Sequence, residues 1–185
     1  MSLMLPDSLI ELFELAGSDD FPQQDSHRHD LAQIVHQSLT QATLIRTAST
    51  RFAHAHDLNL VDFNVLGAVV AGAGKSITVT PGYISEALAL SASTLTSILE
   101  RLADRSLLMR DRDESDKRRI AIYYTQEAAQ LIIEFYREVG VAYEEVFGNV
   151  DDATLSAVTN TVEELNSANR RAGEIIGEHY GTVRA

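Results

Sequence analysis

The segment of residues 107–124, LLMRDRDESDKRRIAIYY, constrains the fold more than any other part of the chain. Its two short apolar runs, 107–109 and 120–124, have the composition of β-strands. The charged residues 111–119 between them are too polar to be buried. The pattern predicts a β-hairpin with a basic tip. A helical segment rich in hydroxyl side chains comes directly before it, and this order is typical of a winged helix-turn-helix.

Two short helices are predicted before the hairpin. Thr80 and Pro81 form a strong helix start, because a hydroxyl can cap the first turn and proline fits the first helical position. Ser91 is expected to cap the second helix, which runs to about Arg105. Its buried stripe has helical spacing and consists of Leu95, Ile98, Leu99 and Leu102.

The outer face of this second helix carries small hydroxyl side chains and one arginine, which let a backbone approach another surface closely. An ordinary solvent-exposed face is the alternative interpretation. If the helix enters a major groove, its candidate DNA-binding residues are Ser91, Ser93, Thr94, Thr96, Ser97 and Arg101.

Longer helices are predicted on both sides of this block. Residues 30–56 have apolar side chains every three or four positions, and Asn59 can cap the helix that follows. Glycines 72 and 74 are expected to end that helix, before a short β-prone piece at residues 77–79. Thr125 and Asp151 can cap two long C-terminal helices with narrow apolar stripes, which are typical of a dimerisation region.

The expected fold class is therefore mainly α with a small β-hairpin (α+β), a winged helix-turn-helix flanked by long dimerisation helices. The predicted organisation is a leader with a short helix at 1–29, an N-terminal dimerisation helix at 30–57, a winged helix-turn-helix DNA-binding domain at 58–125 and a C-terminal helical dimerisation region at 126–180.

The charge distribution restricts where nucleic acid could bind. The net charge of the chain is −12, yet residues 100–119 hold 7 of its 15 Lys and Arg beside 6 acids, a net charge of +1. Any phosphate-binding surface must therefore be local, and the acidic remainder would fix its docking orientation. The wing residues expected to contact DNA are Arg112, Lys117, Arg118 and Arg119.

Several other classes of function are disfavoured. The chain has no Cys, which excludes disulfides, thiol oxidation and thiolate metal sites. No apolar run approaches the ~18 residues that cross a membrane, so a cytoplasmic protein without membrane contact is expected. The six His have surface or capping roles as the favoured interpretation and metal sensing as the alternative. No catalytic arrangement is apparent, so we expect neither an enzyme nor a cofactor or resident metal.

Residues 58–125 resemble the MarR family of bacterial transcription regulators. The most specific part of the resemblance is the D-K-R-R sequence of residues 116–119, followed six residues after Arg119 by Thr125. The flanking helices extend the resemblance over roughly residues 30–175. It implies a homodimer on a pseudo-palindromic double-stranded operator, with the helix after Ser91 in the major groove and the wing at the flanking minor groove. It also implies that Asp116 holds the shape of the wing and that Arg118 reaches into the minor groove.

The resemblance further implies a regulator, expected to be a repressor, that responds to a small aromatic or phenolic effector. The candidate pocket residues are Phe13, Phe52, Phe63 and Tyr83, each of which could instead be ordinary core. Ser106 stands where the family often has glycine, so the turn there is expected to differ. The acidic composition supports an alternative function, that of a protein-binding winged-helix adaptor that does not bind DNA.

Overall fold

The computed structural model describes residues 26–75, 77–112 and 118–181. The chain divides into two compact units, Met1–Ala48 and Ser49–Ala185. Helix α2 (Ser26–Ala55) begins in the first unit and ends in the second. The second unit contains every later element, including the whole helix-turn-helix and hairpin.

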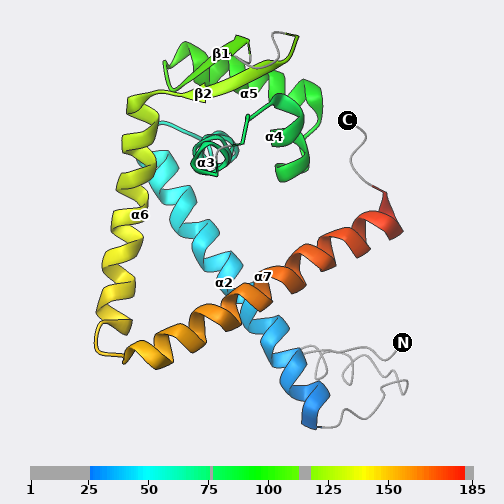
Figure 1. Cartoon of the computed structure of the whole chain (residues 1–185), viewed down its shortest axis with the longest axis vertical. Coiled ribbons are helices and arrows are strands. Elements are labelled where there is room, and N and C mark those ends of the chain that lie inside the picture. Colours follow the sequence, from blue (N-terminus) through cyan, green and yellow to red (C-terminus); the bar gives the residue numbers. More distant parts are fainter. Residues whose placement is uncertain (1–25, 76, 113–117, 182–185) are drawn as a thin grey trace. The chain divides into compact units, whose positions relative to one another are not determined.

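The element order confirms the predicted fold class, which is mainly helical with one two-stranded antiparallel sheet (Figure 1). The elements after α2 are α3 (Leu60–Gly74), α4 (Pro81–Leu88), α5 (Ala92–Asp104), β1 (Leu108–Arg112), β2 (Ile120–Tyr124), α6 (Gln126–Phe147) and α7 (Asp152–Tyr180).

Five of the helices begin at the capping residues that the sequence predicts. In each case the side-chain oxygen accepts a hydrogen bond from the backbone N–H three residues later, which satisfies one of the free donors of the first turn. The caps of α3, α4, α5, α6 and α7 are Asn59, Thr80, Ser91, Thr125 and Asp151.

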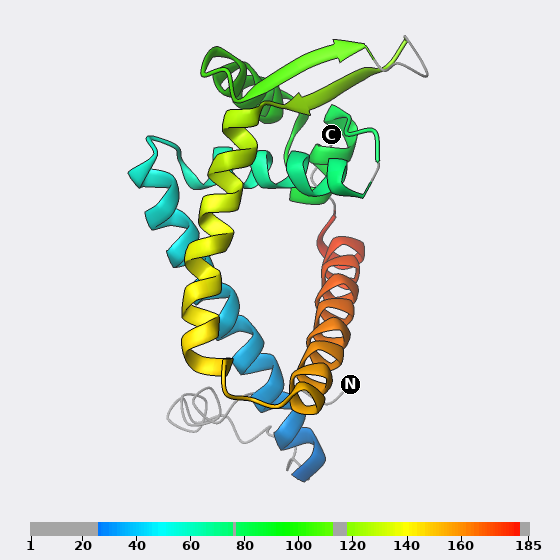
Figure 2. The same ribbon diagram turned by 60° about the vertical axis from the view of Figure 1, so that its left-hand side comes forward.

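Helix α3 lies at the centre of the winged domain, and its residues Val65, Leu66 and Val69 are fully buried. Helices α4 and α5 and strand β2 all contact it. The predicted stripe of α5 faces this core, since its four leucine and isoleucine side chains are buried. Figure 2 shows the hairpin extending away from the start of α6 beside the helix-turn-helix.

Gly72 allows the chain to fold back onto the end of α3. A Cβ at this position would stand 2.7 Å from Cγ2 of Val79 and 3.2 Å from Cε1 of Tyr83. Helix α3 continues past Gly72 and includes Gly74, so the prediction that both glycines end the helix was wrong at Gly72. The glycine is needed here for close packing.

The segment of residues 77–79, expected to be β-prone, is not a strand of the sheet but is joined to the hairpin. The backbone N–H of Ile122 donates to the carbonyl of Val79 at 2.8 Å. The hairpin itself pairs Leu108 with Tyr124 and Arg112 with Ile120. The bond between Ile122 and Val79 connects the wing to the residues between α3 and α4.

The turn after α5 corrects a prediction. Ser106 has φ 56°, which is the left-handed conformation that a glycine would adopt. Its N–H donates to the carbonyl of Ala103 at 2.8 Å, and the N–H of Leu107 donates to Leu102 at 2.9 Å. The helix-ending hydrogen bonds therefore hold the turn despite a cost of roughly 1–2 kcal/mol for a left-handed side-chain-bearing residue.

Candidate nucleic-acid interface

The exposed face of α5 is uncharged in its N-terminal half. Ser93, Thr94, Thr96 and Ser97 are exposed, and Ser91 is half-buried at the cap. Thr96 Oγ1 donates to the carbonyl of Ala92 at 2.8 Å, and Ser97 Oγ donates to that of Ser93 at 3.3 Å. Because these hydroxyl protons bond the helix itself, the oxygens present lone pairs outward and can accept hydrogen bonds from donors on base edges.

Arg101 lies in a different environment from these hydroxyls. Its Nε donates to Oδ2 of Asp62 at 2.8 Å, and its Nη2 donates to Oδ1 of the same carboxylate. Asp62 is only 2% exposed. The hydrogen bond to Asp62 is the main cause that raises the pKa of Arg101, against a smaller opposing effect of burial. The guanidinium therefore joins α5 to the first turn of α3.

Two further arginines, absent from the predicted site, also make structural contacts. Arg105 Nη1 donates to the carbonyl of Asp57 at 2.6 Å, and its Nη2 donates to that of His56 at 3.0 Å. Arg110, in β1, donates from Nη2 to the carbonyl of Thr96 at 3.2 Å. Arg105 thus binds α5 to the corner before α3, and Arg110 binds the wing to α5.

The remaining arginines of the basic segment gather at one end of the hairpin. Arg112 ends β1 opposite Ile120, which begins β2, and Arg118 and Arg119 directly precede Ile120. All three arginines are exposed. The predicted wing residues Asp116 and Lys117 lie outside the described residues.

Three of the four predicted aromatic pocket residues lie in or against the hydrophobic core. The ring centroid of Phe63 is 5.5 Å from that of Phe52 and 5.1 Å from that of Phe135, and Phe63 is 5% exposed. Tyr83 packs against the same core, and Phe13 lies outside the described residues. Phe63 is a core side chain, and Phe52 is half-buried and packs against that core.

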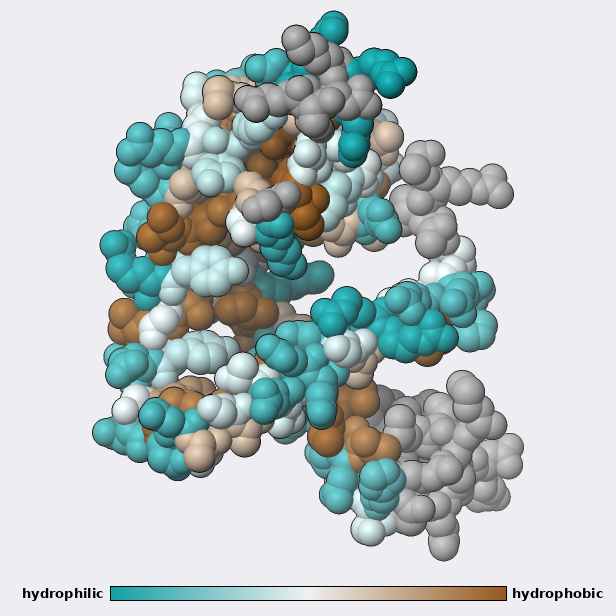
Figure 3. Space-filling view, in the orientation of Figure 1, coloured by the Kyte–Doolittle hydropathy of each residue, from teal (hydrophilic) through white to brown (hydrophobic). Residues whose placement is uncertain are grey.

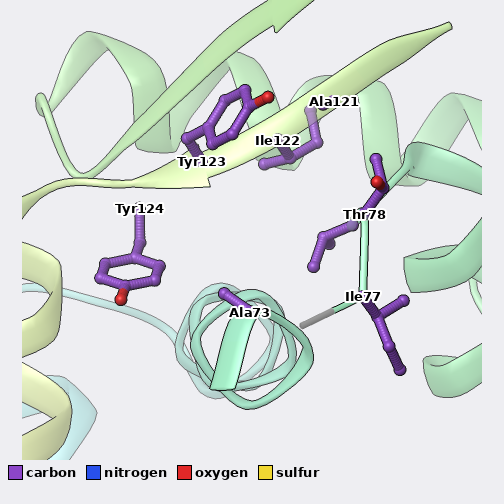
Figure 4. A pocket seen from close by; sticks show the side chains of 8 residues that line it. Ala73, Ile77, Thr78, Ala121, Ile122, Tyr123 and Tyr124 are labelled. Carbon is purple, nitrogen blue, oxygen red and sulfur yellow. The ribbon is translucent and has the colours of Figure 1, made fainter. Parts of the chain in front are cut away.

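A cavity of about 520 Å³ lies instead between the end of α3, residues 77–79 and β2. Figure 4 shows Tyr124 and Tyr123 on opposite faces of β2, with Tyr124 directed toward the part of α3 that carries Ala73. The cavity combines a phenol with apolar walls, as small-molecule sites commonly do. It is lined by Ala73, Ile77, Thr78, Val79, Ala121, Ile122, Tyr123 and Tyr124.

The described part of the chain was found to contain neither a metal-ligand cluster nor a membrane-spanning helix. Residues 26–75, 77–112 and 118–181 contain no cluster of three or more His, Asp or Glu arranged to hold a metal ion. Among the same residues, no helix is both long and apolar enough to span a membrane.

Comparisons with known proteins agree with this geometry. Residues 56–119 match the model of the MarR family. The fold is similar to that of the transcriptional regulator BldR from Sulfolobus solfataricus, with a TM-score of 0.56, 19% identity and coverage of 80% of this chain and 99% of BldR. No curated protein matches the chain in sequence.

Two other solved structures with this fold contain a bound partner. A MepR–DNA complex from S. aureus gives a TM-score of 0.52 at 16% identity, covering 72% of this chain and 98% of MepR. CouR from Rhodococcus jostii RHA1, bound to p-coumaroyl-CoA, gives 0.50 at 20% identity, covering 76% of this chain and 92% of CouR. Residues 56–119 are thus similar in sequence to the MarR family, and most of the chain is similar in fold to these three solved structures.

Proposed function

We propose that the chain is a dimeric, DNA-binding transcription regulator that acts as a repressor and is released from DNA by a small molecule. The observation that carries this proposal is the presence of two complementary surfaces on one winged domain. One is the uncharged hydroxyl face of α5, and the other is the group of three exposed arginines at the end of the hairpin. The fold is that of transcription regulators rather than of enzymes.

The two surfaces would divide the work of DNA recognition. The hydroxyl side chains of Ser91, Ser93, Thr94, Thr96 and Ser97 accept hydrogen bonds or contact phosphates in the major groove. In the wing, Arg112, Arg118 and Arg119, together with Lys117, neutralise phosphates, and Arg118 enters the narrow minor groove. Asp116 keeps the wing in shape. The MepR–DNA complex supports DNA binding by the chain, because it contains a similar fold bound to DNA.

The proposal of a dimer rests on the exposed side chains of the C-terminal helices α6 and α7. Every residue of α7 is described, and none of its side chains is buried. Tyr136 and Val146 of α6 are 69% and 71% exposed, and Figure 3 shows apolar side chains at the surface along α6. A helix with an exposed apolar stripe is stabilised mainly by packing against another surface. We assign that role to a second copy, with residues 30–57 and 126–180 forming the interface.

The proposed effector is a small aromatic or phenolic molecule. The 520 Å³ cavity beside β2 has a suitable volume and includes the phenol of Tyr124, and β2 is itself one strand of the wing. CouR provides an example of this fold with an aromatic thioester bound. A ligand that prefers one arrangement of the wing would shift the population of DNA-competent dimers. Release of DNA on addition of phenolic acids or their thioesters tests this part.

A protein-binding adaptor remains the second candidate function, because the net charge of −12 opposes contact with DNA over most of the surface. The two candidates differ in one respect that can be measured. A regulator retains particular duplex sequences, whereas an adaptor retains none.

Selection of random-sequence duplexes by the purified full chain tests the proposal. We expect the retained duplexes to contain two inverted half-sites about 10 base pairs apart, since a two-fold dimer presents two recognition helices roughly 34–36 Å apart. Their affinity should exceed that for a scrambled duplex of equal length by about 10³-fold or more. Recovery of single half-sites would contradict the dimer, and equal affinity for scrambled DNA would contradict the regulator.

A further inference from the structure

Helix α5 has an unusual charge pattern for a helix that enters DNA. Its charged side chains are Glu100, Arg101 and Asp104. Arg101 is paired with Asp62, so the charges left on the exposed face of α5 are the two carboxylates. The C-terminal half of this face would repel phosphates, and the N-terminal half carries hydroxyls only.

The pair formed by Asp62 and Arg101 holds two elements that are far apart in sequence. Asp62 lies in the first turn of α3, 39 positions before Arg101, and its side chain is 3% exposed, against 47% for that of Arg101. Both carboxylate oxygens accept hydrogen bonds from the same guanidinium. A buried carboxylate has few other ways to be solvated, so it depends on this partner.

The same dependence keeps Arg101 away from the groove. If Arg101 turned toward a guanine, it would leave the Asp62 carboxylate buried without a counter-charge. The free-energy cost of that unpaired charge exceeds the free energy gained from one base contact. Arg105 secures the C-terminal end of α5 through the carbonyls of His56 and Asp57. Two neighbouring arginines therefore hold α5 on the α2–α3 corner.

We propose that Arg101 is a positioning residue, which fixes α5 on α3 through Asp62 and does not itself contact DNA. This inference rests on the proposed DNA-binding function and sharpens it. The recognition helix then reads its half-site without an arginine, through the hydroxyls and methyl groups of residues 91–97. Such a face accepts hydrogen bonds from adenine N6 or cytosine N4 and contacts thymine methyls, whereas guanine N7 and O6 receive no charged donor from α5.

A double-variant experiment separates positioning from direct contact. The variants are Asp62→Leu, Arg101→Met and their combination, titrated with the tightest duplex selected by the wild-type chain. Each single change leaves one member of the Asp62–Arg101 pair without its partner between α3 and α5. It should therefore lower the affinity for the duplex about tenfold or more. The double change replaces the ion pair by apolar side chains of similar volume, which is often neutral for folding. We expect it to recover affinity to within about threefold of the wild type, with the dependence of affinity on salt unchanged.

Direct contact by Arg101 predicts the opposite. The double variant would stay as weak as Arg101→Met, and the slope of log affinity against log salt would fall by about one for the lost phosphate or base contact. Either result overturns the proposal. If the wild type selects no duplex, the proposed function fails as well, so the two failures are distinguishable.

A milder variant covers the case in which the single changes do not fold. Asp62→Asn keeps the shape of the side chain and can still accept one hydrogen bond, so a folded protein is expected. A positioning role predicts a loss of about three- to tenfold in affinity for the selected duplex, since Asp62 is buried and touches no DNA. Unchanged or tighter binding, as expected from an arginine released toward DNA, would contradict the inference.

Discussion

Replacement of Arg118 by alanine is expected to lower the affinity for the selected duplex by about 10- to 100-fold while the dimer stays folded. Arg118 is exposed and lies two residues before the start of β2, next to Arg119 and at the same end of the hairpin as Arg112. An arginine in a narrow minor groove gains from the enhanced negative potential there, and its loss removes both that interaction and a phosphate charge. Fluorescence anisotropy at a fixed salt concentration measures the change.

Lys75→Ala provides a matched control for this prediction. Lys75 is an exposed cation directly after α3, outside the α5 hydroxyl face, the wing and the proposed dimer interface. Removing it changes the net charge of the chain by the same amount, so its affinity for the duplex should stay within about twofold of the wild type. Equal affinities for the two variants would remove the wing from the mechanism.

Phe63→Ala is expected to lower the free energy of unfolding by about 3–5 kcal/mol. The Phe63 side chain is nearly fully buried, and its ring lies between those of Phe52 at the end of α2 and Phe135 in α6. Its truncation leaves a cavity where three helices meet, and it removes two edge-on or tilted ring contacts. Urea unfolding followed by circular dichroism gives the shift in midpoint.

Val61→Ala on the same helix is the control, because Val61 is 41% exposed and should change the stability by no more than about 0.5 kcal/mol. A small effect of Phe63→Ala, comparable to that of Val61→Ala, would show that the aromatic cluster is not part of the core. It would also restore Phe63 as a candidate for lining an effector pocket.

The helices and the hairpin could be predicted because their signals are local. Thr80, Ser91 and Thr125 each cap a helix through a bond to the residue three positions later, and hydroxyls in that position are visible in sequence. The buried stripe of α5 follows from its spacing alone. Because that stripe is buried, the hydroxyl side chains on the opposite side of α5 are exposed.

The roles of the arginines could not be predicted in the same way. Seven basic residues fall within residues 100–119, and sequence gives no reason to separate those that fold the domain from those that face outward. Arg101 and Arg105 bond to residues 39 to 49 positions earlier, so their partners appear only when α3 and α5 pack together. The conformation of Ser106 could not be predicted from its residue type either. The hydrogen bonds that end α5 outweigh the preference of serine against a left-handed conformation.

The salt dependence of duplex binding by the wild-type chain tests the central claim most directly. Arg112, Lys117, Arg118 and Arg119 of each proposed wing give eight cations in a dimer. At about 0.9 released counterion per neutralised phosphate, log affinity should fall linearly with log salt with a slope of about −7, between roughly 50 and 200 mM salt. A slope near zero, or no measurable binding at low salt, would contradict DNA recognition by this wing and favour the protein-binding adaptor.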